Sequence, residues 1–276
     1  MHFINSPGPD MSDLSAATIA ELVSTAHELA DAAREATLAH FRRTDLAAET
    51  KETDRFDPVT VADRLSEERM RAILARRRPQ DGILGEEFGS LAGTSGLTWV
   101  LDPIDGTRGY LSGTPTWGVL ISVADASGPI YGLIDQPYIR ERFEGGFGRA
   151  RVVGPTGEAR LRCRPARPLS EAILFSTFPE VGTVEEGAAF RRVSSRARLT
   201  RYGTDCYAYG LVAAGMIDAV IEAGLQAYDV QAPIAVIQAA GGLVTDWTGG
   251  PCHAGGRVVA AANPQIHAEM LALLNG

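Results

Sequence analysis

The chain has 276 residues, 45% of them hydrophobic, and a formal net charge of −8 at pH 7. This length allows a large core in one or two subdomains, and the acidic balance disfavours a general surface for nucleic acid or for an anionic membrane. A phosphorylated substrate stays compatible with this charge, because metal ions can supply a local positive field.

The three cysteines lie far apart, without a CxxC pair and without histidines at zinc spacing. We therefore expect them to be reduced in a cytoplasmic protein. No apolar run reaches the length of a membrane span, and no basic region followed by an apolar one indicates a signal peptide. Residues 1–12 have the composition of a loose leader, so Met1 and Met11 are both candidate starts.

In the first half of the chain, two helices precede a run of strands. Apolar residues at helical spacing predict a helix over residues 13–43, with Ser12 and Asp13 as candidate N-caps. The polar segment 47–58 is expected to be a loop or a short hairpin, and a second helix is expected over residues 60–77. Five strands, expected to form an antiparallel meander, are predicted at residues 82–84, 98–101, 118–125, 129–136 and 142–146.

Past about residue 150, strands and helices alternate. Strands are predicted at residues 173–176, 198–202, 219–222, 243–245 and 258–261. Helices are predicted at residues 184–195, 206–214, 229–240 and 267–274. We therefore expect an N-terminal α+β half over residues 13–148, with an antiparallel sheet and two helices, and a C-terminal α/β half over residues 149–276.

The most informative stretch covers residues 98–113 and reads TWVLDPIDGTRGYLSG. Asp102 follows an apolar strand and Asp105 follows a turn imposed by proline, so both carboxylates can point to one place. Convergent carboxylates repel each other unless a cation lies between them, and all-oxygen ligation suits Mg²⁺. Gly106 and Thr107 then offer N–H groups and a hydroxyl to an anion or to a nucleophilic water. A metal beside an anion cradle indicates phosphate chemistry.

A purely structural interpretation of this motif is also open. Asp-Gly after a strand often forms a turn, and Asp or Thr before a helix often caps it. Haloacid-dehalogenase-type phosphatases are disfavoured, because their two aspartates are separated by one residue whereas two residues separate Asp102 from Asp105.

Three further acidic elements occur at the ends of predicted strands or helices. Glu86 and Glu87 follow a predicted strand, and Asp63 and Asp229 lie at the starts of predicted helices. Each has a structural alternative: helix capping for the two aspartates, and a solvated surface pair for the two glutamates. Together with the motif above, they predict an acidic site.

These elements resemble the motifs of the inositol-monophosphatase-like, Mg²⁺-dependent and Li⁺-sensitive phosphatases. The resemblance extends from about residue 15 to the end of the chain, and the motifs occur in the family's order and spacing. They are DPVTVAD at 57–63, GEE at 85–87, WVLDPIDGT at 99–107 and YDVQAP at 228–233. The resemblance implies a layered α-β-α-β-α sandwich, which agrees with the two halves predicted above.

The resemblance also implies two or three bound Mg²⁺ ions. Glu86, Asp102 and the backbone carbonyl of Ile104 would hold the first ion. Asp102, Asp105 and Asp229 would hold the second, and Glu86 would help to hold a weaker third ion through water.

Catalytic roles follow from the same resemblance. Thr107, hydrogen-bonded to Asp63, would orient the attacking water, with Glu86 as the third member of the catalytic set. The N–H groups of Gly106 and Thr107 would bind the phosphate. Attack by water would be in line, with no covalent phospho-enzyme. The 47–58 segment matches a family loop of variable length, so Lys51 is assigned no role.

Substrate choice is expected to lie in the second half, which most resembles the histidinol-phosphate phosphatases of the family. The segments RYGTDCYAYGLVAAG at 201–215 and IEAGLQAYD at 221–229 carry this resemblance. By this resemblance, Asp205 and Glu222 face the substrate, and their charge suits the cationic amine and the imidazole of L-histidinol phosphate. For Asp205, capping of the helix near Cys206 is the structural alternative.

The sequence thus predicts a metal-dependent phosphomonoesterase that converts L-histidinol phosphate to L-histidinol and phosphate, a step of histidine biosynthesis. The nearest alternative is the same chemistry on inositol-1-phosphate or another sugar phosphate. An alternative of another class is a regulatory protein of this fold that binds RNA or RNA polymerase, but an RNA surface should be basic. Members of the family are commonly homodimers, so a homodimer with a small phosphorylated substrate is expected.

Overall fold

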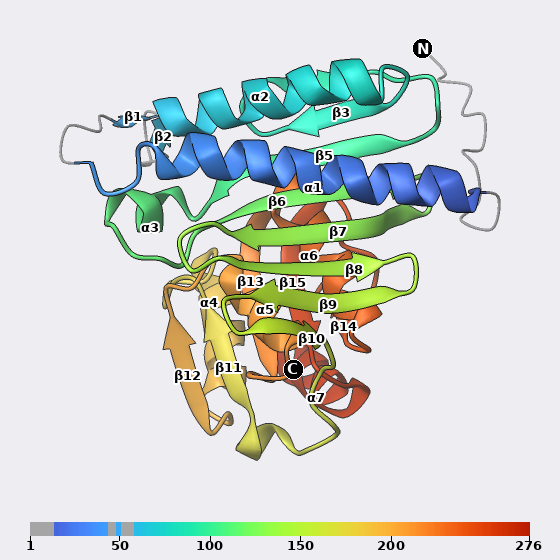
Figure 1. The fold of residues 1–276 in the computed structure, drawn as a ribbon. Helices are drawn as coiled ribbons and strands as arrows, with labels where there is room; N and C mark the ends of the chain where they lie inside the picture. The colour runs from blue at the N-terminus through green and yellow to red at the C-terminus, as the bar shows by residue number, and fades with distance from the viewer. Residues whose placement is uncertain (1–13, 44–47, 51–57) are drawn as a thin grey trace, which may run out of the picture.

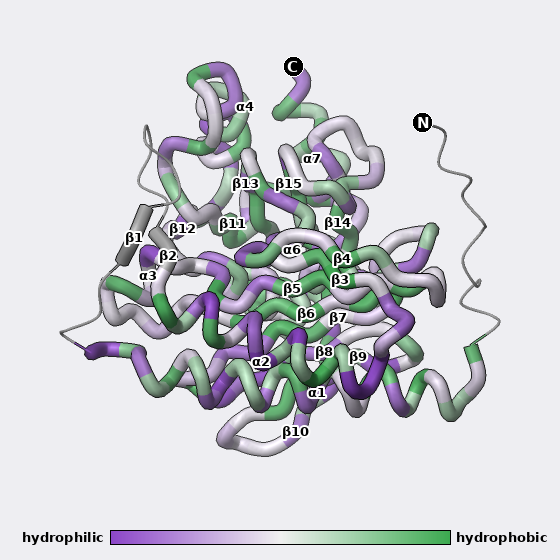
Figure 2. Tube along the Cα trace, turned by 90° about the horizontal axis from the view of Figure 1, so that it is seen from above, coloured by the Kyte–Doolittle hydropathy of each residue, from purple (hydrophilic) through white to green (hydrophobic). Residues whose placement is uncertain are grey.

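The computed structural model describes residues 14–43, 48–50 and 58–276, which stack in five layers (Figures 1 and 2). In order, the layers are α1 (Ala16–Leu38) and α2 (Val61–Arg77), a large sheet, α5 (Tyr207–Ala213) and α6 (Ala227–Ala239), a smaller sheet, and α4 (Val184–Ser194) and α7 (Pro264–Asn275). The predicted α-β-α-β-α sandwich is therefore confirmed.

The larger sheet has eight strands in the order β10-β9-β8-β7-β6-β5-β3-β4. They are β3 (Gly82–Gly85), β4 (Gly89–Leu91), β5 (Thr98–Asp105), β6 (Gly118–Asp125), β7 (Gly128–Gln136), β8 (Glu141–Gly146), β9 (Arg149–Gly154) and β10 (Gly157–Arg160). The predicted antiparallel meander is confirmed from β5 to β8, whereas β3 runs parallel to β5. The sheet continues through β9 and β10 to Arg160, past residue 148, where we expected the first half to end.

The smaller sheet has five strands in the order β12-β11-β13-β15-β14. They are β11 (Ile173–Ser176), β12 (Leu199–Tyr202), β13 (Ala219–Gln226), β14 (Leu243–Thr245) and β15 (Gly255–Ala261). All five strands were predicted, but β13 is four residues longer at its end and β15 is three residues longer at its start. Short elements complete the described chain: the hairpin strands β1 (Ala48–Thr50) and β2 (Pro58–Thr60), α3 (Thr107–Leu111) and the 3-10 helix η2 (Leu169–Glu171).

Helix α1 is shorter than the predicted range of residues 13–43. It begins after Ser15, whose hydroxyl accepts a hydrogen bond from the N–H of Thr18 at 3.1 Å. The candidate N-caps Ser12 and Asp13 lie outside the described residues. Strands β1 and β2 form an antiparallel pair, which agrees with the short-hairpin alternative, and Lys51 lies outside the described residues.

Three large clusters of apolar side chains fill the four spaces between the layers, because the cluster around α5 and α6 packs on both sheets. On β6, Val119 and Ile121 pack towards α1 and α2, while Leu120 packs towards the middle helices. Because both faces of the larger sheet are covered, β6 is apolar at consecutive positions and does not alternate with polar residues. Among the helices of the described residues, none combines the length and the hydropathy that a membrane span requires.

Helix α6 packs on two glycines of the larger sheet, Gly132 of β7 and Gly145 of β8, which pair with each other. A Cβ built on Gly132 would lie 2.4 Å from the carbonyl oxygen of Ala232, and one built on Gly145 would lie 2.5 Å from the Cα of Val236. These neighbours are backbone atoms of the helix, which cannot turn away as a side chain can. The glycine pair therefore lets α6 pack closely on the sheet.

We expect Gly145→Ala to lower the free energy of unfolding by about 1–3 kcal/mol or more, since the methyl group would push α6 off the sheet. Gly187→Ala in α4 is the matched control, because its nearest neighbour is the flexible end of Arg191, 3.3 Å away. There we expect a neutral or stabilising effect of up to about 1 kcal/mol. Urea unfolding of both variants measures the difference. If Gly145→Ala were as stable as the parent protein, α6 would not need a glycine at this position.

Candidate metal and phosphate site

A cleft of about 370 Å³ opens where the end of β5, the start of α3, the end of β13 and the start of α6 meet. Almost all of the predicted site residues line this cleft. They are Glu86, Asp102, Ile104, Asp105, Gly106, Thr107, Asp205, Glu222 and Asp229. Asp63 is not among the lining residues. Residues that are 143 positions apart in the chain, Glu86 and Asp229, thus reach one cavity.

A bulge in β5 brings its two aspartates to the same side. Asp102 pairs with Leu120 of β6 and Asp105 pairs with Gly118, so three steps along β5 match two steps along β6. In a regular strand, residues three apart would point to opposite faces, and the extra residue of the bulge cancels this alternation. The Oδ1 atom of Asp102 accepts a hydrogen bond from the N–H of Ile104 at 3.0 Å, which fixes the turn.

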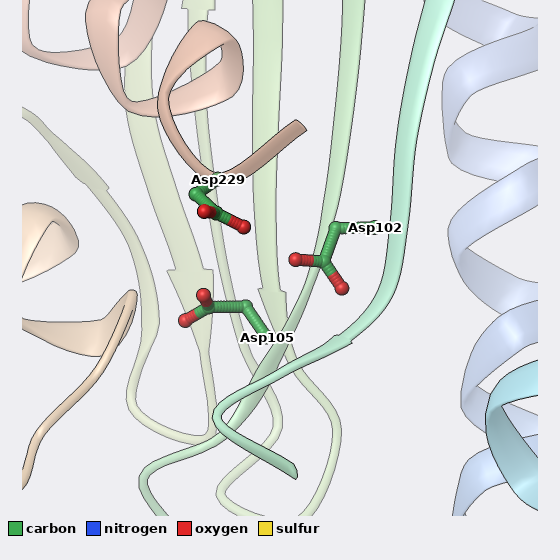
Figure 3. A group of neighbouring side chains, drawn as sticks. All are labelled: Asp102, Asp105 and Asp229. Atoms are coloured by element: carbon green, nitrogen blue, oxygen red, sulfur yellow. The ribbon is translucent and has the colours of Figure 1, made fainter. Parts of the chain in front are cut away.

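Asp229 reaches the two aspartates of β5 from the first turn of α6. Its Oδ2 atom accepts a hydrogen bond from the N–H of Gln226 at 2.7 Å, so the side chain also caps the helix. The carboxylates of Asp102, Asp105 and Asp229 point towards one another (Figure 3), and one oxygen of each lies within 4.8 Å of the others. The capping alternative and the metal-site prediction for Asp229 are thus compatible.

This arrangement concentrates negative charge away from water. Burial raises the pKa of Asp102 well above its usual range, and repulsion from Glu86, Asp105 and Asp229 raises it further. Burial and repulsion from Asp205 likewise raise the pKa of Asp105, although the N–H of Cys206 donates to its carboxylate at 2.6 Å. In the described part of the chain, no arginine or lysine pairs with Asp102 or Asp105.

The donor set fits a hard divalent cation. All the donors that converge here are carboxylate oxygens, and such ligands suit Mg²⁺, Mn²⁺ or Ca²⁺ better than ions that prefer nitrogen or sulfur. A cation between the carboxylates would also remove the repulsion that raises their pKa values. The backbone carbonyl of Ile104 lines the same cleft and could add an oxygen.

Gly106 forms the turn between β5 and α3 in a left-handed conformation, with φ of 86°. A Cβ built on it would lie 2.8 Å from the Cγ atom of Asp205, so only glycine fits between the turn and that side chain. The first N–H groups of a helix have no partner within the helix. The N–H groups of Gly106 and Thr107 are therefore suited to an anion in the cleft.

Thr107 and Asp63 both belong to the described residues, and the hydrogen bond expected between them is not formed. The hydroxyl of Thr107 donates to the carbonyl oxygen of Ile104 at 3.1 Å. Asp63 accepts instead from the N–H and the hydroxyl of Thr60, at 2.8 and 2.6 Å, in a capping box at the start of α2. Local capping holds the Asp63 carboxylate, and burial raises the pKa of that group to about 7.

Asp205 does not cap the helix that follows it, so the structural alternative for this residue is wrong. Helix α5 begins after Cys206 and has no side-chain cap. Asp205 has a left-handed φ of 43°, which is uncommon for a residue other than glycine, and it points into the cleft. Burial raises the pKa of Asp205 to about 6, against the opposing influence of the Arg108 guanidinium.

Glu222 lines the cleft, just before a bulge in β13. Its carboxylate accepts hydrogen bonds from the N–H and the hydroxyl of Thr177, at 2.6 and 2.9 Å. Burial raises the pKa of Glu222 to about 7. Asp205 and Glu222 thus line the same cleft as the aspartates, and their contact with the substrate stays a prediction.

The lining residues that were not predicted include Arg108 and Phe178. The Arg108 guanidinium lies 5.0 Å from the centroid of the Phe178 ring, and both face the cleft. Arg108 directly follows the phosphate-site residues in sequence, which was a usable signal. Phe178 follows strand β11 and lies far from every acidic motif, so no sequence pattern indicated it.

Residues 18–275 match the inositol monophosphatase family. The chain is 38% identical to a protein of Arabidopsis thaliana named bifunctional phosphatase IMPL2, over 94% of this chain and 77% of that protein. It is 37% identical to a histidinol-phosphatase of Streptomyces coelicolor, over 91% of this chain and 95% of that protein.

Other relatives have other names. The chain is 32% identical to an inositol-1-monophosphatase of Mycolicibacterium smegmatis, over 96% of this chain and 95% of that protein. Among solved structures, an inositol monophosphatase from Zymomonas mobilis superimposes with a TM-score of 0.81 at 32% identity, over 95% of this chain and 100% of that chain. The proteins described above all have phosphatase names, and the names that give a substrate differ in it.

Proposed function

Because the chain belongs to the inositol monophosphatase family and is a phosphatase of that family, we propose that it hydrolyses L-histidinol phosphate to L-histidinol and phosphate. The observation that carries the proposal is the convergence of Asp102, Asp105 and Asp229 in the cleft that Asp205 and Glu222 also line. The first three residues suit a metal-assisted attack on a phosphate ester. The other two provide negative charge for the cationic remainder of this substrate.

We assign the metal role to Mg²⁺, two or three ions in each site. Glu86, Asp102, Asp105 and Asp229 would hold them, together with the carbonyl oxygen of Ile104. That oxygen has two lone pairs, so it can accept from Thr107 and still offer a ligand atom. When bound, the ions lower the pKa of a water molecule and neutralise charge on the phosphoryl oxygens.

The remaining residues would bind and orient the reactants. The N–H groups of Gly106 and Thr107 would hold the phosphate at the start of α3, and the Thr107 hydroxyl would orient the attacking water. Asp63 and Glu86 complete the proposed catalytic set. The capping box with Thr60 fixes the Asp63 carboxylate at the start of α2.

The specificity part of the proposal rests on charge. Asp205 and Glu222 lie in the same cleft as the aspartates, so a substrate with its phosphate near Gly106 would direct its other end towards them. Histidinol phosphate has a cationic amine there, whereas inositol-1-phosphate has neutral hydroxyl groups. The Streptomyces relative supports the first substrate, and the Mycolicibacterium relative makes inositol-1-phosphate the second candidate.

The wider setting is proposed on the same basis. We propose that the protein works in the cytoplasm, in histidine biosynthesis, as a homodimer with a small phosphate ester as its partner. The net charge of −8 supports a function without nucleic-acid or membrane partners.

Asp205→Asn tests the specificity assignment. Asparagine tolerates a left-handed φ as aspartate does and keeps the shape of the side chain, so the variant removes mainly the charge. We expect kcat/KM for histidinol phosphate to fall roughly 5- to 150-fold, which corresponds to about 1–3 kcal/mol of lost transition-state stabilisation. The value for inositol-1-phosphate should change little. The ratio of the two kcat/KM values is the measurement. An unchanged ratio would remove Asp205 from substrate recognition.

A further inference from the structure

The turn that carries Glu86 to the cleft lies at an exposed edge of the larger sheet. It links β3 to β4, the edge strand, whose three residues are all exposed. Glu86 and Glu87 are half-buried, and Phe88 is 45% exposed. The N–H of Glu86 donates to the carbonyl oxygen of Leu101 at 3.2 Å, which ties the start of the turn to β5. The rest of the turn needs further partners to have a fixed position.

A buried carboxylate on α2 supplies these partners. The side chain of Glu67 is fully buried, and its Oε2 atom accepts a hydrogen bond from the N–H of Glu87 at 2.7 Å. Its Oε1 atom accepts from the N–H of Phe88 at 3.2 Å and from Nε of Arg71 at 2.7 Å. Arg71 also donates to the carbonyl oxygen of Gly89, the first residue of β4. Glu67 and Arg71 thus hold the turn through three of its backbone groups.

The last residue of β3 is a glycine, which leaves room for this carboxylate. A Cβ built on Gly85 would lie 1.9 Å from Oε1 and 2.4 Å from Cδ of Glu67. Gly85 pairs with Leu101 of the parallel strand β5, so the residues that follow them, Glu86 and Asp102, come at the same level. The Glu67 carboxylate therefore contacts the backbone at the point where β3 turns towards the cleft.

A purely structural interpretation would make Glu67 only the partner of Arg71, four residues further along α2. Such a pair on an exposed helix surface contributes little. Glu67 differs because it is buried, and a buried carboxylate is costly unless hydrogen bonds satisfy its oxygens. Two of its three donors belong to the turn, and hydrogen bonds to a charged acceptor are stronger than neutral ones. The carboxylate and the turn therefore stabilise each other.

We propose that Glu67 is a positioning residue for the metal site, which holds the turn so that the Glu86 carboxylate reaches the carboxylate of Asp102 in the cleft. The inference rests on the proposed function, which assigns Glu86 to the metal ions. A turn that already has this position loses little conformational freedom when an ion binds. Residues that orient metal ligands through hydrogen bonds commonly change metal affinity about 10- to 100-fold when they are replaced.

Calorimetric titration of the metal-free protein with Mg²⁺, without substrate, tests the proposal. Glu67→Gln keeps the size of the side chain but replaces one acceptor oxygen with an NH₂ donor, which would face an N–H of the turn. We expect the affinity for Mg²⁺ to fall at least about tenfold. Glu68→Gln is the matched control, because it removes the same charge from an exposed position of the same helix. Its affinity should stay within about twofold of the parent.

Two further variants separate positioning from a general loss of stability. Met70→Ala removes a buried side chain from α2, so it should lower the unfolding temperature and leave Mg²⁺ affinity nearly unchanged. Glu86→Gln removes the proposed ligand. Because Glu67 acts through Glu86, adding Glu67→Gln to Glu86→Gln should weaken Mg²⁺ binding by less than about twofold. If Glu67→Gln does not fold, Glu67→Asp takes its place, since it keeps the charge but ends one methylene short of the turn.

Three results would overturn the inference. They are Mg²⁺ binding by Glu67→Gln as tight as that of Glu68→Gln, an equal loss of affinity in Met70→Ala, and full additivity of the Glu67→Gln and Glu86→Gln effects in the double variant. A parent protein that binds no Mg²⁺ would contradict the metal role itself, and with it the proposed function. The failure of the inference is therefore distinguishable from the failure of the proposed function.

Discussion

Asp102→Asn should lower the rate of phosphate release by at least about 10³-fold at saturating Mg²⁺. Asp102 lies close to Asp105, Asp229 and Glu86. We propose that its carboxylate binds both of the principal ions. Losing a ligand shared by two ions should remove about 4 kcal/mol or more of transition-state stabilisation. Initial rates of phosphate release measure this effect.

The fold should survive the same change. Asparagine has the shape of aspartate and can still accept the hydrogen bond from the N–H of Ile104. Without metal, the variant should be as stable as the parent or more stable, because one charge is removed from a buried cluster of like charges. Asp125→Asn, at the far end of β6, is the control and should retain full activity. An Asp102→Asn rate within a few-fold of the parent would refute the metal assignment.

Thr107→Ala should lower kcat by about 10²-fold or more while leaving Mg²⁺ affinity nearly unchanged. The Thr107 hydroxyl is assigned to the attacking water, and positioning or proton transfer at the nucleophile commonly contributes at least this much. Thr107→Ser is the matched variant, because it keeps the hydroxyl that donates to Ile104 and removes only a methyl group. It should retain activity within about threefold.

Steady-state kinetics and calorimetric titration with Mg²⁺ separate the two effects. If Thr107→Ala lost metal affinity in parallel with rate, Thr107 would be acting through the metal site and not on the water. If the serine variant were as inactive as the alanine variant, the hydroxyl would have no special role.

Most of the site was predictable because it depends on local sequence. The strand before Asp102, the turn before Asp105 and the helix starts at Asp63 and Asp229 all have short-range signals. What the spacing could not reveal is how the two aspartates of β5 come to face the same way, which requires the bulge opposite Leu120 and Gly118. The Thr107–Asp63 hydrogen bond was wrongly expected, because Asp63 has a closer partner in Thr60.

The fold was predictable for elements whose burial requires a continuous run of apolar residues. Strands β5 to β7 are mainly apolar because both faces of the sheet are covered, and α6 is apolar on all sides because it lies between two sheets. Strand β4 has three exposed residues, and β9 and β10 are rich in arginine and glycine, so none has the apolar alternation that identifies a strand. These three strands form because they pair with neighbouring strands, and such pairing cannot be recognised from the pattern of a single sequence.

The most direct test of the account is phosphate release by the parent protein from L-histidinol phosphate and from inositol-1-phosphate, at matched Mg²⁺ concentration. We predict a higher kcat/KM for histidinol phosphate, loss of activity on chelation, and its recovery when Mg²⁺ is restored. A higher kcat/KM for inositol-1-phosphate would contradict the substrate assignment. Hydrolysis of neither ester, or hydrolysis that persists without metal, would contradict the role given to Asp102, Asp105 and Asp229.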